Sequence, residues 1–284
     1  MKKKLAVIAL AGMMAAGFTT GNVQAAEPGG ELYVFIAASL ANAMEEIQKD
    51  FNEKYPDVEI FYNADSSGTL QKQIEEGSRC DIFFSAATKQ MDALVEEKLA
   101  KEDSVKDLLE NKVVLIKLKD FETKVTGFEN ITEAENLALA GEDVPVGQYA
   151  REIFTNLGIM DQVENMEINE GKNVTEVLAA ITQGSNEVGV VYATDAASVA
   201  DQVEIIAEAP AEALETPVLY PVGLTEDQEA SSAEQEAAEV FLEYLQTEEA
   251  LTVFEEYGFS PYTEEKEESA SEENIENTEE KVAE

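Results

Sequence analysis

Strand-like and helix-like segments alternate along the chain from residue 31 onward. The apolar run from Leu32 to Ile36 is typical of a short strand, and the apolar residues after it recur at the spacing of one helix face: Leu40, Met44, Ile47 and Phe51. Further strand-like runs lie at 58–62, 82–84, 113–116 and 188–192, with helical patterns between them. Strands joined through helices form mostly parallel sheets with helices on their faces. The alternation therefore predicts an α/β fold.

Two serine-containing turns each follow a strand-like run and lead into a helical pattern. They are Ala37-Ala38-Ser39-Leu40 and Ser66-Ser67-Gly68-Thr69-Leu70. The first N–H groups of a helix lack partners and carry partial positive charge, so a hydroxyl beside them completes a cluster of hydrogen-bond donors. Both turns belong at the carboxyl ends of strands, where ligands of such sheets bind. The alternative is that each serine only caps its own helix.

Three later segments carry donors of the same neutral kind. In 144–150, Val146 is expected to precede a helix with its N–H free. In 173–176, Asn173 and Glu176 match a capping box, which leaves the N–H of Val174 uncommitted in the first turn. Tyr192 ends a strand-like run and brings a hydroxyl to the sheet edge. Taken singly, each segment also fits an ordinary turn or core strand.

The two ends of the chain differ in composition from its middle. Residues 1–25 combine a lysine-rich start, a short apolar run and a small-residue end, which is the pattern of a secretory signal peptide. One last helical pattern runs from Glu234 to Tyr257, and the ordered fold is expected to end near Tyr262. Residues 263–284 are dominated by glutamate and have no aromatic residue, so they are predicted to form a disordered acidic tail.

The charge and the cysteine count restrict location and partners. A formal charge of −41 disfavours nucleic acid and anionic membranes as partners. A small anion is not excluded, because distant charges are screened in salt while a donor cluster acts locally. The apolar run of the signal is too short for a membrane span, so no membrane insertion is expected. The one cysteine, Cys80, lies beyond the signal, which leaves no lipobox cysteine and predicts a periplasmic protein.

The residue types of the chain give little support for an enzyme or for a metal site. The chain has no histidine, so a Ser-His-Asp triad is impossible, and it has neither a Gly-x-Ser-x-Gly elbow nor a phosphate-binding loop of the P-loop type. Without histidine and with one cysteine, a zinc or copper site is not expected either. We therefore expect no enzyme and no cofactor.

In this order, the donor segments resemble those of the molybdate-binding periplasmic proteins of ABC transporters. The resemblance runs from Leu32 to about Tyr262 and also includes Asn42-Ala43-Met44, Gln73-Ile74-Glu75 and 81–86. It implies a two-lobed periplasmic binding protein fold with the ligand in the interlobe cleft. Each lobe would be a mostly parallel sheet flanked by helices. The implied division is 27–114 with 216–262 as the first lobe and 115–215 as the second.

The resemblance also implies how the ligand is held. Hydroxyl and amide groups of Ser39 and Ser67, main-chain N–H groups of Val146 and Val174, and the Tyr192 hydroxyl would bind molybdate or tungstate. No protein atom would coordinate molybdenum directly. The family commonly has alanine at the position of Val146, and some members have serine at that of Gly68. The expected partner is the membrane permease of an ABC transporter, and the protein itself is expected to be a monomer.

Two other functions remain open from the residues alone. A receptor for sulfate or another tetrahedral oxyanion would need the same donors, because charge and geometry do not separate these dianions. A secreted acidic interaction protein would use the charged surface and tail and would not need the five donor segments.

Overall fold

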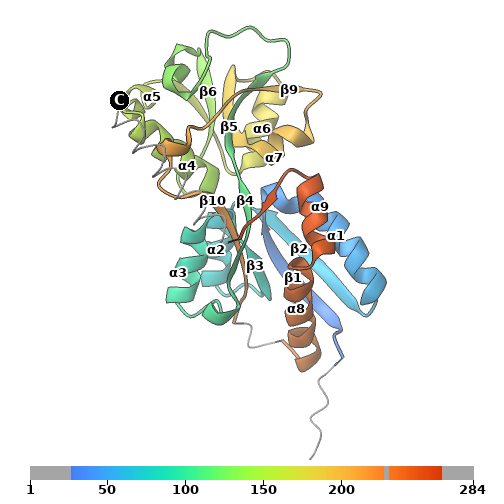
Figure 1. The fold of residues 1–284 in the computed structure, drawn as a ribbon. Coiled ribbons are helices and arrows are strands. Elements are labelled where there is room, and N and C mark those ends of the chain that lie inside the picture. Colours follow the sequence, from blue (N-terminus) through green and yellow to red (C-terminus); the bar gives the residue numbers. More distant parts are fainter. Residues whose placement is uncertain (1–26, 227–229, 264–284) are drawn as a thin grey trace, which may run out of the picture.

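The computed structural model describes residues 27–226 and 230–263, which form two α/β lobes one above the other (Figure 1). The predicted signal peptide lies outside the described residues, as does the predicted acidic tail apart from Thr263. The two-lobed α/β fold that the resemblance implied is confirmed. Within the described residues, no helix has the length and apolar character needed to cross a membrane.

The first lobe, drawn in blue, teal and orange in Figure 1, is built on a sheet with the strand order β11-β4-β10-β3-β1-β2. Its strands are β1 (Gly30–Ala37), β2 (Val58–Asp65), β3 (Ile82–Phe84), β4 (Lys106–Asn111), β10 (Val218–Leu224) and β11 (Ser260–Pro261). Its helices are η1 (Ala38–Leu40), α1 (Ala41–Lys54), α2 (Ser67–Glu75), α3 (Thr88–Glu96), η2 (Glu102–Ser104), α8 (Ser232–Leu245) and α9 (Glu248–Glu256).

The second lobe is built on a sheet with the order β7-β6-β8-β5-β9. Its strands are β5 (Val113–Leu118), β6 (Asn136–Ala140), β7 (Glu167–Gly171), β8 (Val188–Tyr192) and β9 (Val203–Glu208). Its helices are η3 (Phe128–Glu133), α4 (Pro145–Asn156), α5 (Met160–Val163), α6 (Val174–Thr182), α7 (Ala193–Ser198) and η4 (Ala211–Ala213). Helix α4 stops before Gly158, whose φ of +71° is the left-handed conformation in which helices commonly end.

Both sheets combine parallel and antiparallel pairs. β1 pairs in parallel with β2 and β3, and β6 pairs in parallel with β7 and β8, as strand-helix-strand units require. β10 runs antiparallel to β3 and β4, and β5 runs antiparallel to β8 and β9. The donor segments follow the carboxyl ends of β1 and β2 in the first lobe and of β6, β7 and β8 in the second, and these ends meet where the lobes face each other.

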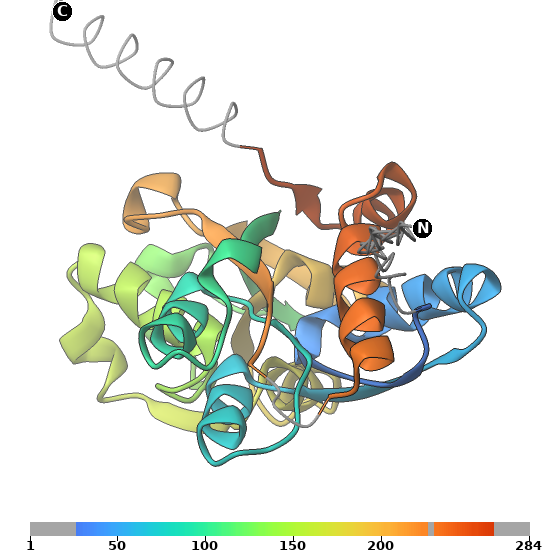
Figure 2. The same ribbon diagram turned by 90° about the horizontal axis from the view of Figure 1, so that it is seen from below.

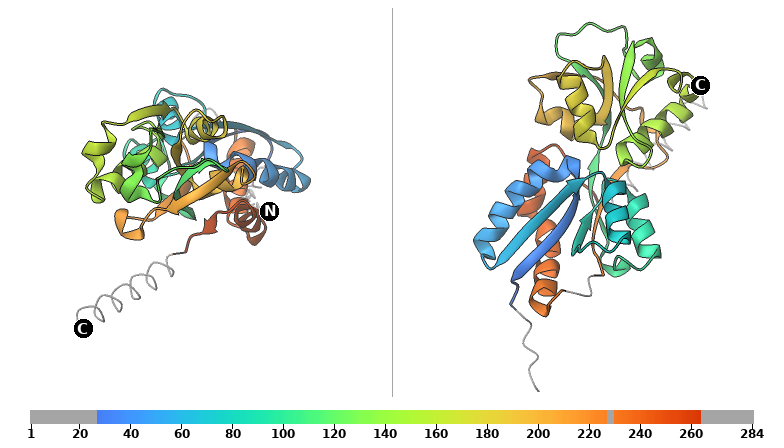
Figure 3. Two further views of the ribbon diagram at one scale, coloured as in Figure 1. Left: turned by 90° about the horizontal axis from the view of Figure 1, so that it is seen from above. Right: turned by 180° about the vertical axis from the view of Figure 1, so that it is seen from behind.

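Side-chain alternation in β1 explains why its whole run is apolar. Val34 and Ile36 point into the large core with α1 and α8, whereas Phe35 packs on the opposite face with α2 and α3. Helices thus cover both faces of this sheet (Figures 2 and 3). A strand buried on both faces is continuously hydrophobic instead of alternating.

The chain passes between the lobes near Lys112 and again between β9 and β10. The first boundary was predicted after residue 114, but Val113 and Val114 already pair with β8, opposite Tyr192 and Val191. The lobe change therefore falls at Lys112. The second predicted boundary, after residue 215, lies within the connection from Glu208 to Val218. The right-hand view of Figure 3 shows the junction of the two lobes from behind.

One predicted helix is two helices. The pattern from Glu234 to Tyr257 is interrupted between Leu245 and Glu248, where Thr247 caps α9 by accepting a hydrogen bond from the Ala250 N–H at 3.3 Å. The apolar spacing continues across this break because both helices pack on the same core, so periodicity alone does not reveal it.

Candidate anion-binding site

All five predicted ligand residues line one cavity between the two lobes. Ser39 and Ser67 come from the first lobe, and Val146, Val174 and Tyr192 come from the second. The free space inside the cavity is only about 10 Å³. This is about the room that one water molecule needs, roughly 10–15 Å³, and far below that of pockets for drug-sized ligands, so the space suits a small ion better than a sugar or a peptide.

Ser39 is not a helix cap. It lies inside the 3-10 turn η1, and the residue at the cap position of α1 is Leu40. The Ser39 Oγ instead lies 2.9 Å from the hydroxyl of Tyr220 on β10. The capping alternative is therefore wrong for this serine, which leaves its hydroxyl for the cavity.

Ser67 is the first residue of α2, and its neighbour Ser66 is the cap. Ser66 Oγ accepts a hydrogen bond from the Thr69 N–H at 3.2 Å. Ser67 Oγ accepts one from the Ala86 N–H at 2.9 Å. An N–H can only donate, so the hydroxyl hydrogen of Ser67 is not used in this bond and is available to an anion.

Val146 and Val174 both present main-chain N–H groups from the first turns of helices. Val146 is the second residue of α4, which begins at Pro145, so it lies inside the helix and does not precede it as predicted. Val174 is the first residue of α6. N–H groups at these positions have no carbonyl within their own helix, and the helix dipole makes them favourable for an anion.

The predicted capping box before α6 is only half formed. Asn173 Oδ1 accepts from the Glu176 N–H at 3.0 Å, as expected of the cap. Glu176 Oε2, however, accepts from the Lys172 N–H at 2.8 Å and not from that of Asn173. The Asn173 amide turns its own N–H toward the other lobe, where it donates to Asp65 Oδ1 at 3.0 Å.

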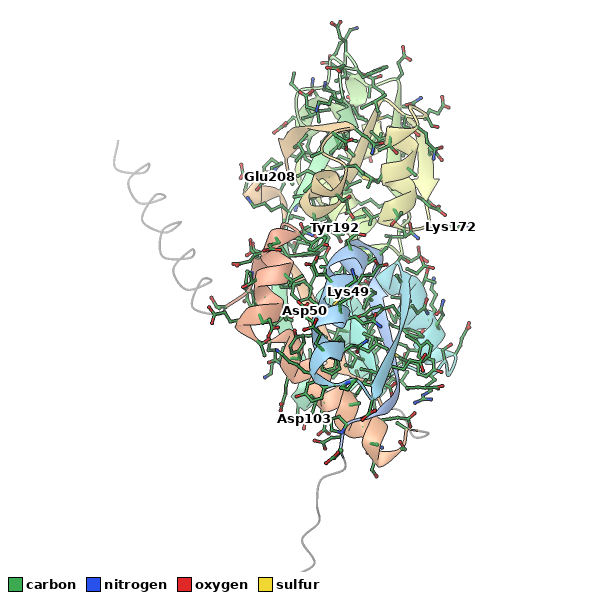
Figure 4. All side chains as sticks on the ribbon, turned by 90° about the vertical axis from the view of Figure 1, so that its right-hand side faces the viewer. Lys49, Asp50, Asp103, Lys172, Tyr192 and Glu208 are labelled. Atoms are coloured by element: carbon green, nitrogen blue, oxygen red, sulfur yellow. The ribbon has the colours of Figure 1, made fainter. Side chains whose placement is uncertain are left out.

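Tyr192 ends β8 and lies at the junction of the lobes (Figure 4). The residue is 2% exposed, and its hydroxyl has no hydrogen-bond partner among the described residues. Burial raises the pKa of this phenol well above its ordinary value, so it keeps its proton at neutral pH. A buried, unpaired donor carries a desolvation penalty, which a bound acceptor would remove.

The cavity lining contains Asp65 but, among the described residues, neither lysine nor arginine. Asp65 Oδ1 accepts from the Ser66 N–H at 2.8 Å as well as from Asn173. Sequence reasoning missed this interlobe bond. Its only sequence signal is that Asp65 directly precedes the serine turn.

Gly68 brings the two lobes into close contact. A Cβ at this position would lie 1.9 Å from the main-chain oxygen of Asp143, which belongs to the other lobe. Next to it, Lys72 Nζ pairs with Asp143 Oδ2 at 2.7 Å, but both side chains are more than half exposed, so this pair adds little stability. The helix α2 therefore approaches the second lobe as closely as a glycine permits.

Ser39 also borders a larger open groove on its other side. Asp195 and Glu256 line that groove together with Asn42 and Thr175. Its lining thus includes two carboxyl groups, against one in the smaller cavity, where Asp65 already accepts hydrogen bonds from Ser66 and Asn173. The five predicted ligand residues lie together in the smaller cavity.

Comparison with known proteins identifies the class. Residues 32–260 match the family described as "Bacterial extracellular solute-binding protein". The chain belongs to this family of solute-binding proteins, which bind ligands and are not enzymes.

Two individual relatives are similar to most of the chain. The chain is 41% identical to "Putative ABC transporter substrate-binding lipoprotein YvgL" of Bacillus subtilis (strain 168), over 81% of this chain and 86% of that protein. It is 36% identical to the molybdate-binding protein ModA of Haemophilus influenzae, over 80% of this chain and 89% of the relative.

A solved structure agrees with these relatives. The substrate-binding domain of a "putative molybdenum ABC transporter from Clostridium difficile" superposes with a TM-score of 0.62 at 35% identity, over 82% of this chain and 99% of that one. Within the solute-binding class, the chain is a member of the molybdate-binding family of ABC transporter proteins.

Proposed function

We propose that this protein binds molybdate, and tungstate as well, in the interlobe cavity and delivers it to the permease of an ABC transporter. The observation that carries the proposal is the Tyr192 hydroxyl, which is buried, protonated and unpaired beside four other neutral donors from two lobes. The molybdate-binding relatives that match most of the chain support the choice of ligand.

Each residue that we propose to bind the anion has a defined hydrogen-bond donor. Ser39 and Ser67 contribute hydroxyl and amide groups, Val146 and Val174 contribute N–H groups, and Tyr192 contributes its hydroxyl. A hydrogen bond to a charged group contributes about 1.5–3 kcal/mol net. Several such bonds reach the roughly −8 kcal/mol of micromolar binding after the costs of ordering are subtracted. Neutral donors also avoid an unpaired buried cation when the cavity holds no anion.

Delivery requires that the transporter senses occupancy. Donors from both lobes contact one anion together only when the lobes are closed, so binding shifts the population toward the closed form. We propose that the permease recognises this closed form and that the protein works outside the cytoplasm, in the periplasm. The single cysteine of the sequence, Cys80, is buried, so its thiol is not exposed for reaction in that compartment.

Isothermal titration of the dialysed mature protein tests the proposal. Molybdate, tungstate, sulfate and phosphate are titrated in the same buffer and salt. One-to-one binding of molybdate and tungstate, with weaker sulfate, is expected. A preference for sulfate would change the substrate but keep the site, whereas no heat and no thermal shift with any of the four anions would overturn the proposal.

A further inference from the structure

A buried polar chain leads from the hinge between the lobes to Ser39. Asn111, the last residue of β4, donates from Nδ2 to the Tyr220 hydroxyl at 3.2 Å and to Thr194 Oγ1 at 2.9 Å. The Tyr220 hydroxyl in turn lies 2.9 Å from Ser39 Oγ. Asn111 and Thr194 are each 5% exposed, and Tyr220 is fully buried.

The direction of the first bond is fixed by the surroundings of Asn111. Its Oδ1 accepts a hydrogen bond from the Lys112 N–H at 2.8 Å, so the oxygen of the amide must face the main chain. The NH₂ group then faces Tyr220 and Thr194, and its two hydrogens serve these two oxygens. An amide turned by 180° would place two oxygens together and leave the Lys112 N–H without its acceptor.

This direction determines the next bond. The Tyr220 oxygen accepts from Asn111, and burial raises the pKa of the phenol well above its ordinary value, so the hydroxyl keeps a hydrogen. Ser39 Oγ is its other near partner, at 2.9 Å. If Ser39 donated to Tyr220, the phenol hydrogen would be buried without an acceptor, which is unfavourable by about 1–3 kcal/mol. Tyr220 therefore donates to Ser39.

The Ser39 hydroxyl is then left with its own hydrogen to offer to the cavity. We propose that Asn111 and Tyr220 are positioning residues that hold Ser39 as a hydrogen-bond donor and so make the site selective for fully deprotonated oxyanions. This inference rests on the proposed oxyanion function. A protonated anion such as hydrogen phosphate needs an acceptor for its O–H. A serine held in this direction offers its second lone pair only if its own hydrogen turns away from the anion and loses its acceptor, which is unfavourable.

Ser67 is also held as a hydrogen-bond donor, but by a bond to the main chain and not to a side chain. Its Oγ accepts from the Ala86 N–H, a main-chain group that no side-chain substitution removes. Ser39 instead depends on Tyr220 of β10, which is itself hydrogen-bonded by Asn111 of β4, and these two strands pair with each other beside the hinge (Figure 1). The direction of the Ser39 hydroxyl can therefore be changed by substituting a neighbouring side chain, whereas that of Ser67 cannot.

Tyr220→Phe is the direct test. Sulfate and phosphate are tetrahedral and of similar size, but phosphate keeps at least one proton at neutral pH, so their ratio isolates the effect of the proton. We expect sulfate and molybdate to bind about 3- to 10-fold more weakly in this variant, the effect of one hydrogen bond. Freed from Tyr220, Ser39 can turn and accept from phosphate, so phosphate should lose less and the phosphate-to-sulfate affinity ratio should rise at least about threefold.

A second variant and a control complete the test. Asn111→Asp keeps the shape but replaces the donor by an acceptor, so it should shift the same ratio in the same direction. Tyr62→Phe is the control, because the Tyr62 hydroxyl donates to the Met44 carbonyl at 3.0 Å in the same lobe and does not line the cavity. It should leave the ratio unchanged. Thermal melting verifies that each variant is folded.

The outcomes separate this inference from the proposed function. If the wild-type protein binds no oxyanion, the proposed function itself fails. If the wild type binds oxyanions but the phosphate-to-sulfate ratio of folded Tyr220→Phe equals that of the wild type, the positioning role is wrong and the function stands. A uniform loss of all three anions in Tyr220→Phe would likewise contradict the selectivity argument, because it would indicate a merely structural tyrosine.

Discussion

At the scale of single residues, the site is defined by where hydroxyl hydrogens point. Ser67 accepts from the Ala86 N–H, and Ser39 is 2.9 Å from Tyr220, so both hydroxyls already have a partner within the protein. Tyr192 has none among the described residues. The three hydroxyls should therefore respond differently to removal, because only some of them contribute to the unliganded fold.

Tyr192→Phe should separate binding from stability. The lost hydroxyl makes no hydrogen bond within the described protein, so the unliganded variant should melt at the same temperature as the wild type or slightly higher. Molybdate should bind more weakly by about 1–3 kcal/mol. Calorimetric titration and thermal melting measure the two effects, and a marked drop in the melting temperature of the unliganded variant would contradict this account of Tyr192.

Ser67→Ala should lower both quantities. It removes a proposed donor to the anion, which should weaken molybdate binding by about 1–3 kcal/mol, and it also leaves the buried Ala86 N–H without its acceptor. The melting temperature of the unliganded protein should therefore fall, unlike that of Tyr192→Phe. The same two measurements apply, and equal melting of Ser67→Ala and wild type would show that the Ala86 bond is unimportant.

Asp195 should give the second lobe an unusual pH dependence. Burial raises the pKa of this carboxyl to about 7, outweighing the hydrogen bond that it accepts from the Tyr192 N–H. Unfolded aspartate has a pKa near 3.9, so between roughly pH 4 and 7 the folded state holds a proton that the unfolded state has lost. The contribution of Asp195 to stability therefore falls as pH rises through this window, by on the order of 1 kcal/mol per unit.

Urea unfolding of Asp195→Asn between pH 4 and 8 measures this effect. The asparagine keeps an acceptor for the Tyr192 N–H and does not ionise, so the stability of the variant relative to wild type should increase from pH 4 to 7 and then level off. Asp201→Asn, at an exposed position of the same lobe, is the control and should show no such trend. A constant difference between Asp195→Asn and wild type across this range would refute the argument.

At the scale of elements, helix α2 determines how closely the lobes approach. Gly68→Ala places a methyl group where the main-chain oxygen of Asp143 lies, and the lobes must separate to accommodate it. Molybdate affinity should fall at least about tenfold, equivalent to about 1.4 kcal/mol. The unliganded first lobe should not be destabilised, because alanine is a better helix former than glycine by about 1 kcal/mol.

Lys72→Met provides the matched control for that prediction. It breaks the exposed Lys72–Asp143 pair at the same interlobe contact without adding bulk beside the Asp143 carbonyl. Titration with molybdate should show almost unchanged affinity for Lys72→Met and a clear loss for Gly68→Ala. Equal losses in both variants would indicate that the ion pair, and not the close approach, determines closure.

At the scale of the whole molecule, binding should change its shape. Two lobes connected near Lys112 and through the segment from Glu208 to Val218 can open as rigid bodies, and the proposed donors of both lobes would hold them together around an anion. Small-angle scattering should show a smaller radius of gyration with saturating molybdate than without it, and a smaller change for Gly68→Ala. Identical scattering curves with and without molybdate would argue against closure on the ligand.

Much of this molecule follows from local sequence. The apolar alternation from Leu32 onward determined the α/β class, because strand and helix periodicities depend on neighbouring residues. The donor turns determined which five residues reach the cavity, because first-turn N–H groups and strand-end hydroxyls are local features that recur at one edge of parallel sheets. The break at Thr247 was missed, since the core-facing spacing passes over it.

What only the tertiary structure decided is which partner each polar group has. Ser39 and Tyr220 are 181 residues apart in sequence, and Asn173 and Asp65 are 108 apart, so no local pattern links them. The direction of a hydroxyl hydrogen depends on the donors and acceptors packed around it, and these come from other strands and from the other lobe. The sequence thus determined which donors are present, and the packing of distant segments determined which way they point.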